Sequence, residues 1–378
     1  MESVTVKNHE LIEDALEKVF SLKDRLKRLE LGSFPRANQK RAVDALHYIL
    51  SKLREGLELA LSTPEKDANN EDRKLTEPLW NIHETIGSIY DFIEKLELSS
   101  TSHTPLGAIY LVEHLAEKVK AKIAPIICFH GKTFSHLTLN HILKLEGDIR
   151  KRLDHIVMFT IPATLRDDVL SYCLVTRELT LHVILTEENI DAPLLSTAAD
   201  VLSSLMLGPA YLYALEKFLQ TRRTPPSEVT PRLRIIAKTL KDEGYPEHLL
   251  TRLGSNSQAQ NEGDEALQAL KQRFKKTRAY YPPEQFNLEV PQLTSRILAL
   301  TPPNEIVIPS KKETLPAQIP SIINAGWLVR KNHMNKIYEA FNAKKPEEKY
   351  QVKRRFNALI EKAIELSIIH KTLMEGPT

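Results

Sequence analysis

The feature that most constrains the fold of this chain is the spacing of its apolar residues, which recur every three or four positions over long stretches. In residues 8–31 and 37–61 this spacing predicts two amphipathic helices, with Lys and Glu on their polar faces. A Gly-Pro break over 32–35 separates them, and two long helices joined by so short a connection form an antiparallel hairpin. A third helix is expected over 76–98. Residues 1–98 are therefore predicted to be an N-terminal helical region.

The rest of the chain is predicted to be mostly helical, with a small β element inside it. Two apolar runs with β-branched residues, 123–129 and 156–162, end at turn signals and predict buried strands. Helices are expected over 106–119, 136–153, 167–186, 192–219 with a break at Gly208-Pro209, 232–243, 265–280, 320–342 and 346–373. A polar run over 99–105 marks a boundary, so a second domain is expected over 104–378. The predicted fold class is mainly α with a small β element (α+β).

Composition narrows the class of protein. Only 12 Gly stand against 22 Pro, which favours helices over β-sandwiches and barrels. Two cysteines cannot build a disulfide framework or a four-cysteine zinc site. Residues 1–10 lack the apolar core of a secretory signal, and no uncharged apolar stretch reaches the roughly 20 residues of a membrane span. We therefore expect a cytoplasmic protein with no membrane contact.

Three segments of the second domain carry a combination of motifs. They are Leu-Val-Thr-Arg-Glu-Leu-Thr-Leu-His at 174–182, Ser-Thr-Ala-Ala-Asp at 196–200 running on to Leu-Gly-Pro-Ala-Tyr at 207–211, and Asn-Ala-Gly-Trp at 324–327 with Lys-Ala-Ile-Glu-Leu-Ser at 362–367. Together they resemble a group of largely uncharacterised zincin-like proteins classed as metallopeptidases, over about 160–370. The resemblance implies a zincin-like helical domain, in which the first segment is the helix that bears His-Glu-x-x-His.

The positions that differ from this group decide the expected chemistry. A zincin needs two neutral imidazoles at i and i+4, a third ligand from a following helix, and a Glu as general base. The resemblance places Arg177 and Leu181 at the two His positions, Ser196 at the third-ligand position and Glu178 at the base position. Arg stays protonated and Leu has no lone pair, so neither can ligate a metal. We therefore expect no metal and no other cofactor, and Glu178 only as a vestigial general-base position.

This mapping predicts a non-catalytic, zincin-like pseudo-metallopeptidase that acts as a binding or scaffold protein. A metal-dependent hydrolase with a rearranged site is the alternative. Glu178 and His182 share a helix face, and Asp200 could approach from the next helix to complete a zinc site or a proton-transfer group. Against this alternative stands an ordinary Glu–His hydrogen bond, with Arg177 paired to Asp200 or Asp168 so that no carboxylate is buried without a cation.

Two basic segments leave a third function open. Residues 271–281 and 349–355 concentrate Lys and Arg, and Tyr350 and Phe356 accompany the second segment. Basic helices with interleaved aromatic residues can bind nucleic acid, although such a pattern is more often a solvated helix face with the aromatic ring turned inward.

His136 and His141 are five residues apart and diverge by roughly 140° on a helix, so they cannot hold one metal from one helix. With His130 they are expected to be exposed or hydrogen-bonded histidines.

The N-terminal helices are strongly amphipathic, which favours a protein partner or self-association.

Overall fold

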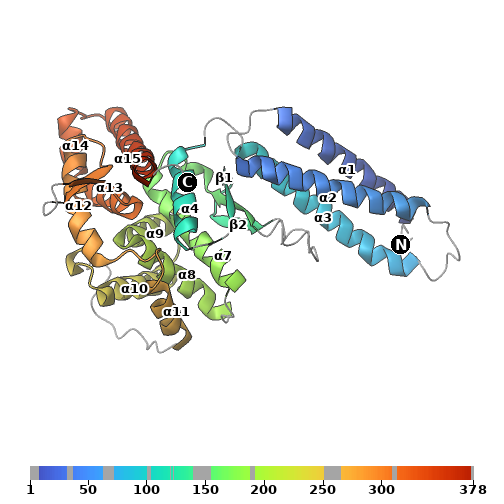
Figure 1. Ribbon diagram of the computed structural model, residues 1–378, viewed down its shortest axis with the longest axis horizontal. Coiled ribbons are helices and arrows are strands. Elements are labelled where there is room, and N and C mark those ends of the chain that lie inside the picture. Colours follow the sequence, from blue (N-terminus) through green and yellow to red (C-terminus); the bar gives the residue numbers. More distant parts are fainter. Residues whose placement is uncertain are drawn as a thin grey trace. The chain divides into compact units, whose positions relative to one another are not determined.

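The computed structural model describes most of the chain. The described residues are 8–31, 37–62, 72–99, 104–119, 121, 123–138, 155–187, 192–250, 265–308 and 313–375. They form mainly α-helices together with two small sheets, which confirms the predicted fold class (Figure 1).

The chain packs as two compact units. The first consists of Met1–Thr104, Ile123–His130 and Leu137–Phe159, and the second of Pro105–Lys122, Gly131–His136 and Thr160–Thr378. This grouping follows packing alone, and the expected domain boundary between residues 98 and 104 stays a prediction.

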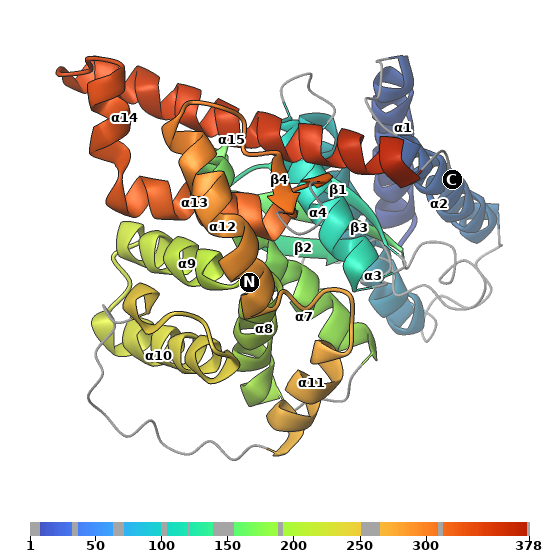
Figure 2. The same ribbon diagram turned by 60° about the vertical axis from the view of Figure 1, so that its left-hand side comes forward.

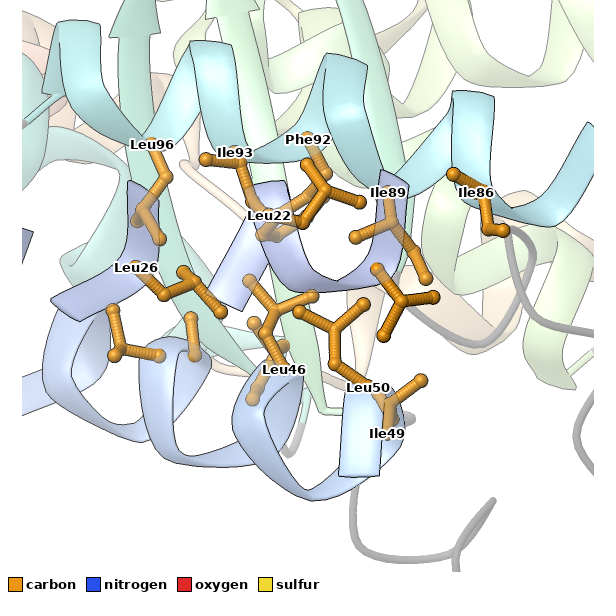
Figure 3. Close-up of a cluster of buried hydrophobic side chains, with 14 of the residues drawn as sticks. Leu22, Leu26, Leu46, Ile49, Leu50, Ile86, Ile89, Phe92, Ile93 and Leu96 are labelled. Atoms are coloured by element: carbon orange, nitrogen blue, oxygen red, sulfur yellow. The ribbon is translucent and has the colours of Figure 1, made fainter. Parts of the chain in front are cut away.

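The first unit is built on three long helices that lie side by side in Figure 1. They are α1 (Asn8–Leu31), α2 (Ala37–Ser62) and α3 (Asp72–Ser99). Leu22 and Leu26 on α1, Leu46 and Leu50 on α2 and Phe92 on α3 are almost completely buried and point toward one another (Figure 3). Each such side chain contributes roughly 1.5–3 kcal/mol through burial, so this apolar cluster is the main source of the unit's stability.

The first sheet has three strands in the order β1-β3-β2. Strands β1 (Ala124–Phe129) and β3 (Ile156–Ile161) lie where strands were expected and are almost completely buried. Strand β2 (Ser135–Thr138) shows that the expected helix over 136–153 was wrong at its start, because strand pairing overrides a weak helical pattern. The remainder of that expected helix, 139–154, lies outside the described residues.

The second unit contains the remaining elements (Figure 2). Its helices before residue 250 are α4 (Leu106–Lys118), η1 (Ala163–Leu165), η2 (Val169–Leu174), α7 (Val175–Glu187), α8 (Ala192–Leu207), α9 (Pro209–Thr221), α10 (Pro226–Glu243) and η3 (Glu247–Leu249). Its later elements are α11 (Glu265–Lys275), α12 (Pro283–Leu298), β4 (Glu305–Ile308), β5 (Glu313–Pro316), α13 (Ile319–Asn332), α14 (Met334–Ala340) and α15 (Pro346–Glu375).

Several boundaries in this unit differ from the expectation. The helix expected over 167–186 begins with the 3-10 segment η2, and the one expected over 320–342 divides at His333. Helix α12 was not expected, although it has Pro283 in its first turn, a position that proline favours. Strands β4 and β5 pair antiparallel, with Ile306 opposite Leu315.

The break between α8 and α9 is held by α13. Gly208 has φ 63° and ψ −149°, a conformation open essentially to glycine alone. The Asn324 side chain on α13 accepts a hydrogen bond from the Ala210 N–H (2.9 Å) and donates one to the Leu207 carbonyl (2.7 Å). One side chain thereby provides hydrogen-bond partners for a backbone carbonyl at the end of α8 and a backbone N–H at the start of α9. This contact links the Gly-Pro-Ala-Tyr motif to the Asn-Ala-Gly-Trp motif.

The next residues of α13 pack closely against η2. A Cβ atom added at Gly326 would lie 2.7 Å from Leu170 Cδ2, so any other residue here would force the buried Leu170 side chain or the helix to shift. The Trp327 indole N–H donates to the Leu170 carbonyl (3.0 Å). These two motifs therefore have a structural role, which is to fix the helices around α7 and α8.

Candidate functional site

The candidate site residues lie on two helices that pack against each other, α7 and α8. Glu178 and His182 occupy one face of α7, and Asp200 lies in the following helix. All three are buried, with 7%, 6% and 3% of their surface exposed. Because buried ionisable groups need partners, the contacts of these side chains determine what the site can do.

Arg177 connects the residues at the zincin-like positions. Its Nη2 donates to Ser196 Oγ (2.9 Å), and its Nη1 donates to Glu178 Oε1 (3.2 Å). Its Nε lies 3.2 Å from Asp200 Oδ1, an ion pair without hydrogen-bond geometry. Burial alone would lower the pKa of Arg177, but Asp200 and the other negative partner groups raise it above its usual value. The guanidinium is therefore a permanent cation between these oxygen atoms.

Asp200 is held from several directions at once. Arg232 donates through Nε to Oδ2 (2.9 Å) and through Nη2 to Oδ1 (3.0 Å), a two-point contact. The Tyr211 hydroxyl donates to Oδ1 (2.7 Å), and burial together with Asp200 raises the pKa of Tyr211 well above its usual value. Arg177 also approaches Oδ1, so the Asp200 carboxylate is committed to internal contacts.

The second oxygen of Glu178 binds a histidine that the sequence did not place in the site. His136 on β2 shares a hydrogen bond with it, with 3.0 Å between Nδ1 and Oε2. The ring of His136 packs edge-on against His182, with 5.7 Å between ring centroids. Burial and the neighbouring His136 lower the pKa of His182 to about 4, so its ring is neutral at pH 7. The sequence pattern missed His136 because it was assigned to a helix.

The residues present do not fit a zinc ion of the zincin type. The guanidinium of Arg177 binds the residues at the base and third-ligand positions, and Leu181 offers no donor atom. Among the described residues, no group of three or more His, Cys, Asp or Glu side chains is arranged to hold a metal ion. In particular, the alternative set of Glu178, His182 and Asp200 does not form such a group.

Asp168, the other expected partner of Arg177, belongs to a separate cluster. It pairs with Lys217 (2.5 Å) and with Arg330 (2.6 Å), and it accepts a hydrogen bond from Ser171 (2.7 Å). Burial tends to raise the pKa of Asp168, but the two cations prevail and lower it below its usual value. Of the two pairings considered for Arg177, the structure has the one with Asp200.

The first basic segment turns its aromatic residues inward. Phe274 and Tyr281 are 8% and 1% exposed. Lys275 pairs with Glu243 (2.7 Å), and the Tyr280 hydroxyl donates to the same carboxylate (2.9 Å). In the second basic segment Phe356 is also buried, whereas Tyr350 is 53% exposed.

Of the three histidines considered together, His141 lies outside the described residues.

Within the described part of the chain, no helix combines the length and the apolar character that crossing a bilayer requires.

Comparisons with protein-family models, with curated proteins and with solved structures find no match. The resemblance to zincin-like proteins therefore stays a prediction from the motifs.

Proposed function

We propose that this chain is a non-catalytic, zincin-like protein that acts by binding a protein partner or a second copy of itself in the cytoplasm. The observation that supports this proposal best is the position of Arg177, at the first ligand position of the resemblance. Its side chain contacts Ser196, Glu178 and Asp200, which are the oxygen-bearing residues around that position.

The physical argument is one of charge. A divalent ion and its ligands form a compensated group, and loss of the ion would leave Glu178 buried without a cation and Asp200 with Arg232 as its cationic partner. An arginine at this position supplies a cation that stays protonated at all physiological pH values. Because each buried carboxylate then has a cationic partner, the fold can persist without the metal and without its chemistry.

A hydrolase with a rearranged site is the second candidate, and one observation favours it. Glu178 orients the His136 ring through Nδ1, and the neutral His182 lies beside that ring. A carboxylate that orients an imidazole is the arrangement used in general base catalysis. In this candidate His136 takes the role that was expected of Asp200.

The metal content of the purified chain tests the proposal. The wild-type protein, Glu178→Gln and His182→Ala would be washed with chelator, reloaded with zinc and analysed by elemental mass spectrometry. We expect no stoichiometric zinc in any of the three. About one zinc per chain in the wild type, lost in either variant, would contradict the proposal and favour the hydrolase.

A triple variant provides the positive control for this measurement. Arg177→His and Leu181→His restore the two His positions of the resemblance, and Ser196→Glu supplies a carboxylate at the third-ligand position, so we expect about one zinc per chain in this variant. If a folded triple variant bound no zinc, α7 and α8 would not have zincin geometry, and the resemblance itself would be wrong.

A further inference from the structure

The corner formed by α14 and the start of α15 is a strongly basic surface whose cationic side chains are exposed. Residues 336–355 contain seven Lys and Arg against three Glu, a net charge of +4 in a chain whose total is +3. The rest of the chain is therefore slightly acidic. The seven cationic residues, all exposed, are Lys336, Lys344, Lys345, Lys349, Lys353, Arg354 and Arg355.

This corner is anchored by apolar side chains rather than by its charges. Ile337, Ala343, Val352 and Phe356 are buried, with exposed fractions of 2–7%. The Glu348 carboxylate accepts the backbone N–H groups of Lys344 and Lys345, at 2.8 and 3.0 Å, at the start of α15. It acts as a helix cap, and these hydrogen bonds use the backbone of Lys344 and Lys345 rather than their ammonium groups.

Most of the positive charges here lack the counter-charges found elsewhere in the second unit. No ion pair among the described residues involves Lys336, Lys353 or Arg354. By contrast Lys275, on the basic helix α11, is paired with Glu243. Unpaired cations held close together repel one another, so an anion bound across them would stabilise the corner.

Aromatic rings lie among these cations and remain accessible. Tyr350 is 53% exposed and Phe341 is 37% exposed. The Arg355 guanidinium lies over the Phe341 ring (5.6 Å to the centroid), and the Lys349 ammonium lies over the ring of Tyr338 (5.5 Å). Phe341 and Tyr338 therefore each have a cation over the ring, and Tyr350 follows Lys349 in the sequence. Exposed rings among cations are the combination that nucleic-acid surfaces use for bases and phosphates.

We propose that this corner, residues 336–355, binds single-stranded nucleic acid, with its cations on the phosphates and Tyr350 and Phe341 stacked on bases. Single strands fit better than duplexes because exposed rings reach only unstacked bases. Accessible aromatic rings between cations give a single strand both stacking surfaces and phosphate contacts, which is why a nucleic acid is the occupant proposed. The inference does not depend on the metal-free nature of the α7–α8 site.

Fluorescence anisotropy of labelled 20-nucleotide oligo-dT and oligo-U, titrated with the full chain, tests the proposal. Four phosphate contacts would weaken binding by about 50-fold between 50 and 200 mM salt. Comparison of the two oligonucleotides distinguishes DNA from RNA, and preference for either supports the proposal. No binding of either at 50 mM salt would overturn it.

Two variants locate the surface. Lys353→Glu with Arg354→Glu is expected to weaken binding by about tenfold or more and to reduce the salt slope by about 1.4. The matched control is Lys40→Glu with Arg41→Glu, which changes the net charge by the same amount at two exposed neighbours on α2. Its affinity for the oligonucleotides should stay within about twofold of wild type, once the effect of net charge alone is allowed for. Equal losses in both double variants would contradict a local site.

The aromatic contribution separates nucleic acid from other polyanions. Tyr350→Ala should weaken oligonucleotide binding by at least about fivefold, whereas Tyr48→Ala, which removes a ring that is 47% exposed on α2, should not. If Tyr350→Ala had no effect, or if anionic phosphatidylserine vesicles or polyglutamate bound as tightly as the oligonucleotides, the surface would be a general anion or membrane contact and the proposal would be wrong.

Discussion

The three-helix bundle and the α7–α8 contact are stabilised in different ways. The core of α1, α2 and α3 is built almost entirely from aliphatic and aromatic side chains, and among the residues whose burial is described Gln39 and Ser99 are its buried polar members. The α7–α8 contact instead buries Glu178, His182 and Asp200 together, each with polar or charged neighbours.

The two regions are therefore expected to differ in how well they tolerate substitutions of their buried residues. Apolar packing is non-directional, so a bundle accepts many side chains of similar volume. A buried ionic network works only when every charge keeps its partner, because removal of one leaves another stranded in a poorly solvated site. The proposed descent from a metal site would account for a polar contact retained at this cost, because its charges would have needed compensation.

A pair of glycine substitutions should sharpen this comparison by giving effects of opposite sign. Gly326→Ala would place a methyl group 2.7 Å from Leu170 Cδ2 in the second unit, and we expect a loss of about 1–3 kcal/mol. Gly87→Ala on α3 meets nothing within 4 Å and should stabilise the bundle by about 0.5–1 kcal/mol. Thermal unfolding followed by circular dichroism measures both. A stabilising Gly326→Ala would contradict the close packing of α13 on η2.

A smaller effect should appear in the pH dependence of the second unit. The pKa of His182 is lowered from 6.5 to about 4, so between these pH values His182 binds a proton in the unfolded chain but not in the folded chain. Its contribution is fully present above pH 6.5 and is lost as the pH falls toward 4. His182→Gln should therefore reduce the slope of stability against pH in this window by up to about 1.4 kcal/mol per pH unit.

The measurement is urea unfolding from pH 4 to 7, observed through tryptophan fluorescence in a Trp80→Phe background. Trp327, which is buried in the second unit, is then the remaining tryptophan. His114, whose pKa is lowered to about 3 mainly by burial, titrates in an overlapping range and provides the residual slope. An unchanged slope in His182→Gln would show that His182 is not buried in its neutral form.

Much of the fold followed from the sequence, because its helices are long and strongly periodic. Helix α1 begins and ends where the apolar spacing predicted, and α2 and α15 begin at the predicted residue and end one and two residues later than predicted. Strand β2 and helix α12 were missed. Four residues such as Ser135–Thr138 carry too little pattern to outweigh a neighbouring helical signal, and their conformation depends on pairing with β3.

The candidate site was predictable only in part. The motifs singled out Arg177, Glu178 and Asp200, and pairing of Arg177 with Asp200 was one of two alternatives. The contributions of Arg232 and His136 could not be read from the sequence, since they lie 32 residues after Asp200 and 42 residues before Glu178. Local periodicity carries no information on which distant side chain completes a buried ion pair.

The central claim is that the Arg177 cation compensates the buried carboxylates of this site, and Arg177→Met tests it most directly. Methionine keeps much of the side-chain volume but removes the charge. Urea unfolding in the Trp80→Phe background should show a loss of about 3 kcal/mol or more at pH 7, whereas Leu46→Met in the bundle, followed by circular dichroism, should cost less than about 1.5 kcal/mol. A change in Arg177→Met below about 0.5 kcal/mol would contradict the account.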